Sequence, residues 1–185
     1  MYSKITELSF DGDSLLDQIS TSSYPDFGLY IFKSRNLFVS IRAGTVGQNG
    51  FGGHAHNDQL SVEIQVYGKD IISDPGTYVY TPLKNCRNKY RSIHSHFAPA
   101  VDGLEPCSLD DGLFRLSDKN TSECIYFGER EVICKTIYND LVIFRRLVIE
   151  HESIKIIDYY PNGHSVTLAN SPVAYSPGYG QVLLE

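Results

Sequence analysis

The chain has 185 residues, 42% of them hydrophobic and 21% charged, which is enough for one folded domain with a sizeable core. Its formal net charge of −6 argues against a general nucleic-acid-binding protein, because such proteins neutralise phosphates with a surplus of basic residues. No apolar run approaches the roughly 18 residues that a membrane-spanning helix needs, so the sequence predicts no such helix.

Short strands separated by turn residues dominate the predicted elements. Residues 14–20 are expected to form a short helix, and residues 28–32 and 37–43 a β-hairpin. Apolar and polar residues alternate strictly from Leu60 to Val66, which predicts a strand with one buried face. Three later runs predict a meander, at residues 131–137, 141–149 and 153–160. This spacing is typical of an all-β protein, either an antiparallel β-sandwich or a barrel.

Histidine and aspartate are concentrated in one part of the chain. Four of the six histidines and three aspartates lie between positions 54 and 96. Histidine nitrogen and aspartate oxygen are common zinc ligands, and histidine is also the side chain most readily protonated near neutral pH. The cluster therefore indicates a metal site, a proton-transfer site, or both side by side.

His56, Asp74 and His96 form the best candidate metal set. His54 and His56 are two residues apart at the expected start of a strand, so both side chains can share a face. Asp74 lies at the end of the next predicted strand. The hairpin formed by these two strands would return Asp74 to the edge of the sheet where His56 lies, and His96 is expected to open another strand. Two imidazoles and one carboxylate suit tetrahedral zinc with a fourth ligand. The competing interpretation is that each histidine is an ordinary hydrogen-bonded residue.

Two other metal motifs deserve comparison. Metallo-β-lactamase-type hydrolases also carry His-x-His-x-Asp, but a histidine follows at once, and here that position is Gln59. A cupin-type site would use a nearby glutamate. Glu63 is the available residue, but the alternation places it on the face opposite Leu60, toward solvent.

A basic segment lies between the last two members of the metal set. No acidic residue occurs between Asp74 and Asp102, whereas Lys84, Arg87 and Arg91 all lie there. Local positive charge on an acidic protein suits a small anionic ligand group better than a nucleic-acid duplex. The alternative is a solvated basic loop with no ligand.

Three motifs resemble one known family. They are Gly-His-Ala-His-Asn-Asp at 53–58, Asp-Pro-Gly-Thr-Tyr-Val-Tyr at 74–80, and Arg-Ser-Ile-His-Ser-His at 91–96, followed by Asp-Gly at 102–103. This order is similar to that of the heparinase II/III-like polysaccharide lyases, over roughly residues 24–183. Ile93, Phe97 and Ala98 depart from the usual Thr, Asn and Thr, which leaves the metal set intact and puts substrate contacts there in doubt.

The resemblance implies a fold and a domain division. Family members pair an N-terminal α/α toroid with a C-terminal antiparallel β-sandwich, and this chain resembles only the sandwich. We therefore expect a lead-in segment at 1–23, a sandwich domain at 24–183, and a toroid supplied elsewhere in the parent protein. Such parents cleave uronic-acid-containing polysaccharides by β-elimination.

The resemblance also implies roles for individual residues. His56, Asp74 and His96 match the zinc ligands, and His54 matches a histidine that faces the substrate cleft. Tyr80 or Tyr90 matches a tyrosine near the cleft, so these three residues are the expected catalytic group. Four basic residues would bind an acidic polysaccharide, namely Lys84, Arg87, Arg91 and His94. The alternative is a non-catalytic carbohydrate-binding sandwich whose loops are tied by the metal.

Overall fold

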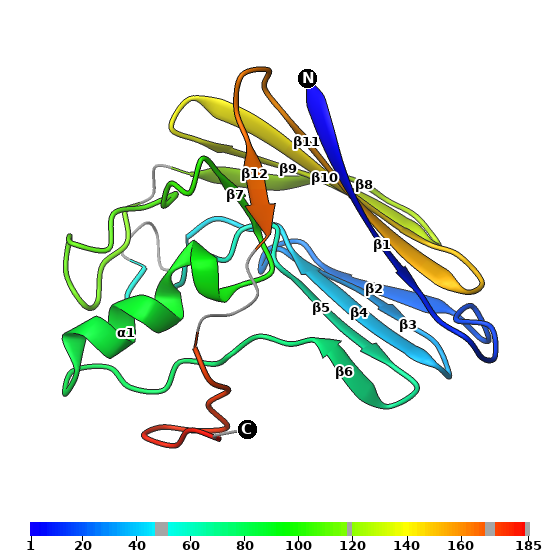
Figure 1. The fold of residues 1–185 in the computed structure, drawn as a ribbon, viewed down its shortest axis with the longest axis horizontal. Helices are drawn as coiled ribbons and strands as arrows, with labels where there is room; N and C mark the ends of the chain where they lie inside the picture. Colours follow the sequence, from blue (N-terminus) through cyan, green and yellow to red (C-terminus); the bar gives the residue numbers. More distant parts are fainter. Residues whose placement is uncertain (47–51, 118–119, 169–172, 184–185) are drawn as a thin grey trace.

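The computed structural model describes residues 1–46, 52–117, 120–168 and 173–183. Two five-stranded antiparallel sheets lie one above the other (Figure 1), which confirms the predicted β-sandwich. The upper sheet has the order β1 (Tyr2–Ser9), β11 (Ser153–Tyr160), β10 (Leu141–Ile149), β9 (Glu131–Tyr138) and β8 (Thr121–Phe127). The lower sheet runs β2 (Ser20–Tyr24), β3 (Leu29–Lys33), β4 (Leu37–Arg42), β5 (Val62–Val66) and β6 (Lys69–Ile72). A small pair, β7 (Pro99–Val101) and β12 (Val166–Leu168), completes the strands.

The predicted hairpin, alternating strand and meander are all present. β3 and β4 pair with Phe32 opposite Val39, and β4 pairs with β5 with Val39 opposite Ile64. The meander follows the predicted runs closely, and its first connection is the two-residue turn Asn139–Asp140. Both turn residues have positive φ, as the common tight hairpin turn requires.

The core lies between the two sheets. Alternate residues of β3, β4 and β5 point upward, and those of β9, β10 and β11 point downward, so that residues such as Val39, Ile64, Leu147 and Ile156 are at most 1% exposed. Burying each such side chain stabilises the fold by about 1.5–3 kcal/mol. The alternating sequence pattern thus determines which face of each strand enters the core.

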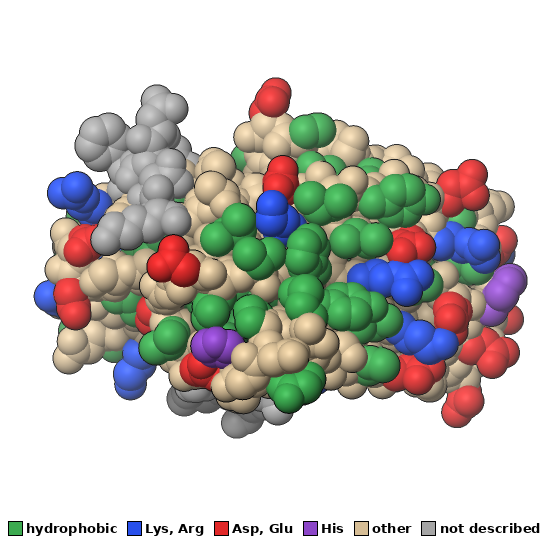
Figure 2. All heavy atoms as spheres, turned by 90° about the horizontal axis from the view of Figure 1, so that it is seen from above, with side chains coloured by type: hydrophobic (Ala, Val, Ile, Leu, Met, Phe, Trp, Pro, Cys, Tyr) green, Lys and Arg blue, Asp and Glu red, His purple; other side chains and the backbone are tan. Residues whose placement is uncertain are grey.

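The outer face of the upper sheet carries a band of hydrophobic side chains between charged ones (Figure 2). These side chains project from the positions that alternate with the core residues, and all are partly buried: Ile133, Ile137, Val142, Phe144 and Ile157. Ion pairs such as Arg146–Glu131 flank the band. None of the described helices is long and apolar enough to cross a membrane.

Residues 14–20 are not helical, so that prediction was wrong. Residues 15–18 form a turn, and β2 starts at Ser20. The backbone N–H of Leu15 donates to the carbonyl of His151, and Gln18 has a φ of 56°, which a helix does not allow. Contacts with the neighbouring β10–β11 connection therefore override the local helical pattern. Within the expected lead-in segment 1–23, β1 adds an edge strand to the upper sheet.

The basic segment is a helix and not the loop that the sequence suggested. Helix α1 spans Lys84–Arg91, and the short 3-10 helix η1 (Ile93–Ser95) follows it. Arg87, Tyr90 and Arg91 are buried, and their spacing of three and four residues places them on one side of α1. Both helices lie at one end of the sandwich (Figure 1), beside the segment that leads into β5.

Candidate metal and active site

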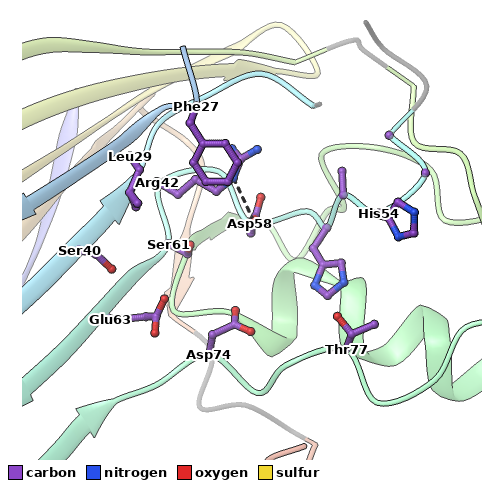
Figure 3. A pocket seen from close by; sticks show the side chains of 14 residues that line it. Phe27, Leu29, Ser40, Arg42, His54, Asp58, Ser61, Glu63, Asp74 and Thr77 are labelled. Carbon is purple, nitrogen blue, oxygen red and sulfur yellow. Dashed lines mark ion pairs between the residues drawn. The ribbon is translucent and has the colours of Figure 1, made fainter. Parts of the chain in front are cut away.

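A cavity of about 510 Å³ runs along the lower sheet toward α1. Phe27 and Leu29 line one end, and His54 and Thr77 the other (Figure 3). Arg42 and Asp58 form an ion pair of 3.2 Å at its wall, which the sequence analysis missed because the two residues are remote in the chain. The motif at 53–58 was the only sequence signal that pointed to Asp58.

The structure brings the three predicted metal ligands together. Nδ1 of His96 lies 2.6 Å from Oδ2 of Asp74, and the rings of His56 and His96 have centroids 5.2 Å apart. The segments that bring them together differ from the predicted ones, because none of the three residues lies within a strand. β5 begins only at Val62, β6 ends at Ile72, and β7 begins at Pro99. The irregular segments after β6, before β5 and after η1 meet here.

Burial and pairing set the charges of these groups. Burial, together with the positive neighbours His96 and Arg87, lowers the pKa of His56 to about 3. Burial alone would lower the pKa of His96, but the hydrogen bond and the charge of Asp74 raise it. The same hydrogen bond holds the pKa of Asp74 below its usual value against the opposing effect of burial. The pair His96–Asp74 is therefore an imidazole oriented by a carboxylate.

The donor atoms fit zinc in type, but their present hydrogen bonds fit it only in part. Nε2 of His96 is buried and has no hydrogen-bond partner in the described part of the chain, as expected of a nitrogen that awaits a ligand. Nε2 of His56, however, accepts a hydrogen bond of 2.9 Å from Nη1 of Arg87, since a guanidinium can only donate. Among the described residues, no three His, Cys, Asp or Glu side chains are already arranged around a metal position. Zinc at Nε2 of His56 requires the guanidinium of Arg87 to turn away.

Of the two candidate tyrosines, only Tyr80 lies beside His54. Its hydroxyl is 3.3 Å from Nδ1 of His54, and the two rings meet edge to face at 5.3 Å. Tyr90 instead points into the protein, where its hydroxyl donates to the carbonyl of Ala174 at 2.7 Å. Burial raises the pKa of Tyr90. His54 is exposed, so the His54–Tyr80 pair faces solvent at the end of the cavity.

Tyr80 belongs to an aromatic group that we define as Tyr80, Phe114 and Tyr179. The ring of Tyr80 lies within 16° of parallel to both others, with centroids 6.0 Å away in each case. Phe114 is 48% exposed and Tyr179 is 61% exposed. Sequence reasoning found only Tyr80, because Phe114 and Tyr179 lie outside all three motifs.

The four predicted substrate-binding residues have different surroundings. Lys84 is exposed at the start of α1, and His94 places Nε2 3.1 Å from the carbonyl of Gly103. Arg87 and Arg91 have no exposed surface. Arg91 bonds to the side chain of Asn88 and to the backbone carbonyls of residues 109, 112, 113 and 115. Arg91 therefore anchors the loop that carries Phe114.

A third buried arginine ties the site to the upper sheet. Arg145 of β10 forms a two-point ion pair with Asp158 of β11, at 2.7 and 2.9 Å. Its Nη1 also donates to the carbonyls of Leu60 and Phe97. Leu60 follows the segment of His54 and His56, and Phe97 follows His96. One side chain thus holds two of the three segments that meet at the site.

A family model described as heparinase II/III-like, C-terminal matches residues 19–160. The chain belongs to this family. A solved structure of heparinase III with methylated lysines has a similar fold, with a TM-score of 0.58 and 16% sequence identity. The match covers 72% of this chain and 20% of that chain, so this chain spans only a small part of that protein. Among curated proteins, no match was found.

Proposed function

We propose that this chain is the sandwich domain of a polysaccharide lyase that cleaves uronic-acid-containing polysaccharide by β-elimination. The observation that carries the proposal is the pairing of His54 and Tyr80 at the open end of the cavity, next to His56, Asp74 and His96. Family membership supports the lyase class, and the geometry supports the choice of residues.

β-Elimination requires a base, an acid and neutralisation of a carboxylate. The base removes the C5 proton beside the sugar carboxylate, and the acid protonates the departing glycosidic oxygen. The C5 proton is only weakly acidic, so positive charge or hydrogen-bond donors must offset the charge that develops on the carboxylate. We assign to His54 either the neutralisation of that charge or the role of base, and to Tyr80 proton exchange with His54; their 3.3 Å contact supports this assignment.

We further propose that His56, Asp74 and His96 hold zinc. When bound, zinc would tie the three segments together and limit the movement of His54, two residues from a ligand. The role is structural, since no motif in the chain marks an activated water. Lys84 is exposed on α1 and His94 lies in η1, and we assign to both the binding of an acidic sugar chain.

The remaining groups for acid–base chemistry would come from the toroid of the parent. The test is the release of unsaturated uronate product by the intact parent, followed by its ultraviolet absorbance, and the dependence of that release on His54. A non-catalytic sandwich tied by metal is the second candidate, because the buried Nε2 of His96 supports a metal whether or not the domain takes part in catalysis. A parent that binds acidic polysaccharide but releases no unsaturated product would favour this second function.

A further inference from the structure

Arg87 and Arg91 have the same burial but opposite hydrogen bonding. They lie one turn apart on α1, and both are 0% exposed. Nε, Nη1 and Nη2 of Arg91 all donate to side-chain or backbone oxygens. In the described part of the chain, Nε and Nη2 of Arg87 have no partner, and only Nη1 donates, to His56. The fold thus satisfies one buried guanidinium and leaves the other with two free donors.

Arg87 also lacks a counter-ion among the residues that the structure describes. None of the described carboxylates forms an ion pair with it, and the imidazole that it contacts offers no negative charge. A buried cation without a partner is costly, because it has lost its water and gained no opposite charge. Such a group either only destabilises the fold or serves to bind an anion.

The two free donors have the geometry of an anion receptor. Nε and Nη2 lie on the same edge of the planar guanidinium and donate in parallel, the arrangement that binds both oxygens of a carboxylate or two oxygens of a sulfate. The contact with His56 uses the other terminal nitrogen and leaves this edge free.

Tyr80 covers Arg87. The central carbon of the guanidinium lies 4.7 Å from the centre of the Tyr80 ring. Beyond Tyr80 are Phe114 and Tyr179, both about half exposed or more, so the aromatic group separates Arg87 from solvent. Tyr80 lies in an irregular segment after β6 that belongs to no described strand or helix, although the carbonyl of Tyr78 accepts a hydrogen bond from the N–H of Gly180. Tyr78 in the same segment has a φ of 61°, which is unfavourable for a bulky residue.

We propose that Arg87 is the receptor for an oxyanion, the carboxylate or sulfate of an acidic sugar, which reaches the guanidinium when Tyr80 moves aside. The oxyanion follows from Arg87 itself, and its attachment to a sugar rests on the proposed function. Because Tyr80 covers Arg87 and also contacts His54, the bound anion would lie close to His54. Arg87 would then supply the positive charge that offsets the uronate carboxylate during elimination.

The first test compares Arg87→Met with Arg91→Met by thermal denaturation of the chain in the presence of EDTA. Methionine keeps much of the length of arginine and removes the charge. We expect Arg87→Met to raise the Tm by roughly 2–4 °C, because an unpaired buried charge is lost. Arg91→Met should lower it by about 5 °C or more, because four backbone carbonyls lose their donor. Unfolding of Arg87→Met, or a fall in its Tm like that of Arg91→Met, would show that Arg87 only supports the fold and would overturn the proposal.

The second test titrates the same metal-free proteins with sodium glucuronate, inorganic sulfate and glucose at constant ionic strength. Glucuronate and sulfate should raise the wild-type Tm in a saturable way, and glucose should not. A stronger response to glucuronate than to sulfate identifies a uronate carboxylate as the ligand, and the reverse identifies a sulfate group. Arg87→Met should abolish both responses. Arg87→Lys should weaken them by about tenfold or more in apparent Kd, because one ammonium cannot bridge two oxygens.

Lys33→Met is the control, since it removes one exposed positive charge from β3, and it should respond like the wild type. An anion response that persists in Arg87→Met, or none in the wild type, overturns the proposal. Both tests measure the Tm of the metal-free chain and therefore require neither bound zinc nor lyase activity. A protein without zinc and without lyase activity would therefore refute the proposed function alone.

Discussion

The hydroxyl of Tyr80 lies 3.3 Å from Nδ1 of His54, although 26 residues separate them in the chain. His54 comes from the segment before β5 and Tyr80 from the segment after β6, so the β5–β6 hairpin returns the two residues to the same edge of the lower sheet. The pair gives the exposed end of the cavity two groups that can exchange a proton.

The first prediction separates the two candidate tyrosines. In the intact parent, Tyr80→Phe should reduce kcat by about 10²–10⁴-fold, because the hydroxyl next to His54 is lost while the ring remains. Tyr90→Phe should keep most of the activity and lose about 1 kcal/mol of stability, since it removes only the hydrogen bond to Ala174. Steady-state kinetics and denaturant unfolding measure the two effects. A larger loss of kcat in Tyr90→Phe than in Tyr80→Phe would assign the catalytic hydroxyl to Tyr90 instead.

The second prediction separates the roles of the two neighbouring histidines. His54→Ala should strongly reduce the rate of the parent and leave zinc bound, because its ring faces the cavity outside the metal set. His56→Ala should lose zinc and thermal stability together. Metal analysis and thermal denaturation of the purified chain give the answer. Equal zinc content in both variants, or a chain that is fully folded and metal-free as purified, would contradict this division.

The third prediction concerns the buried pair of Arg145 and Asp158. Asp158→Ala should lower the free energy of unfolding by about 3–5 kcal/mol, because it leaves a buried guanidinium without its counter-ion. Glu131→Ala is the matched control, since it breaks the ion pair of Arg146 on the outer face of the same sheet. That pair is partly exposed and should contribute less than about 1 kcal/mol. Similar losses in the two variants would argue that Arg145 does not hold the site segments.

The strands of the hairpin and of the meander could be predicted because alternate residues of each enter the core, whereas β2 has no buried residue and was not predicted. The alternation from Leu60 to Val66 survives in β5, whose Val62, Ile64 and Val66 are all buried. The approach of Asp74 to His56 could also be predicted, because a tight hairpin brings the end of one strand back to the start of the other. His96 follows η1, outside this hairpin, and only the motif at 91–96 pointed to it. The three motifs pointed to the heparinase II/III-like family, and the family model confirms that the chain belongs to it.

The environment of α1 could not be predicted from the sequence. Charged residues usually remain solvated, so a segment with two lysines and two arginines resembles an exposed loop. Arg91 is buried only because the loop 109–115 folds over it and supplies carbonyl oxygens. The pairing of Arg42 with Asp58 likewise depends on the packing of β4 beside the site segment and has no local signal.

Elimination activity tests the central claim most directly. The intact parent and residues 1–185 alone are assayed on alginate, heparan sulfate and hyaluronan, and the unsaturated product is followed by its ultraviolet absorbance. We predict product from the parent on at least one polymer and none from the chain alone, because an acid and a base must act from both sides of the sugar. Robust turnover by the chain alone would contradict the division of the site between two domains. A folded parent that releases no unsaturated product from any uronate polymer would contradict the lyase function itself.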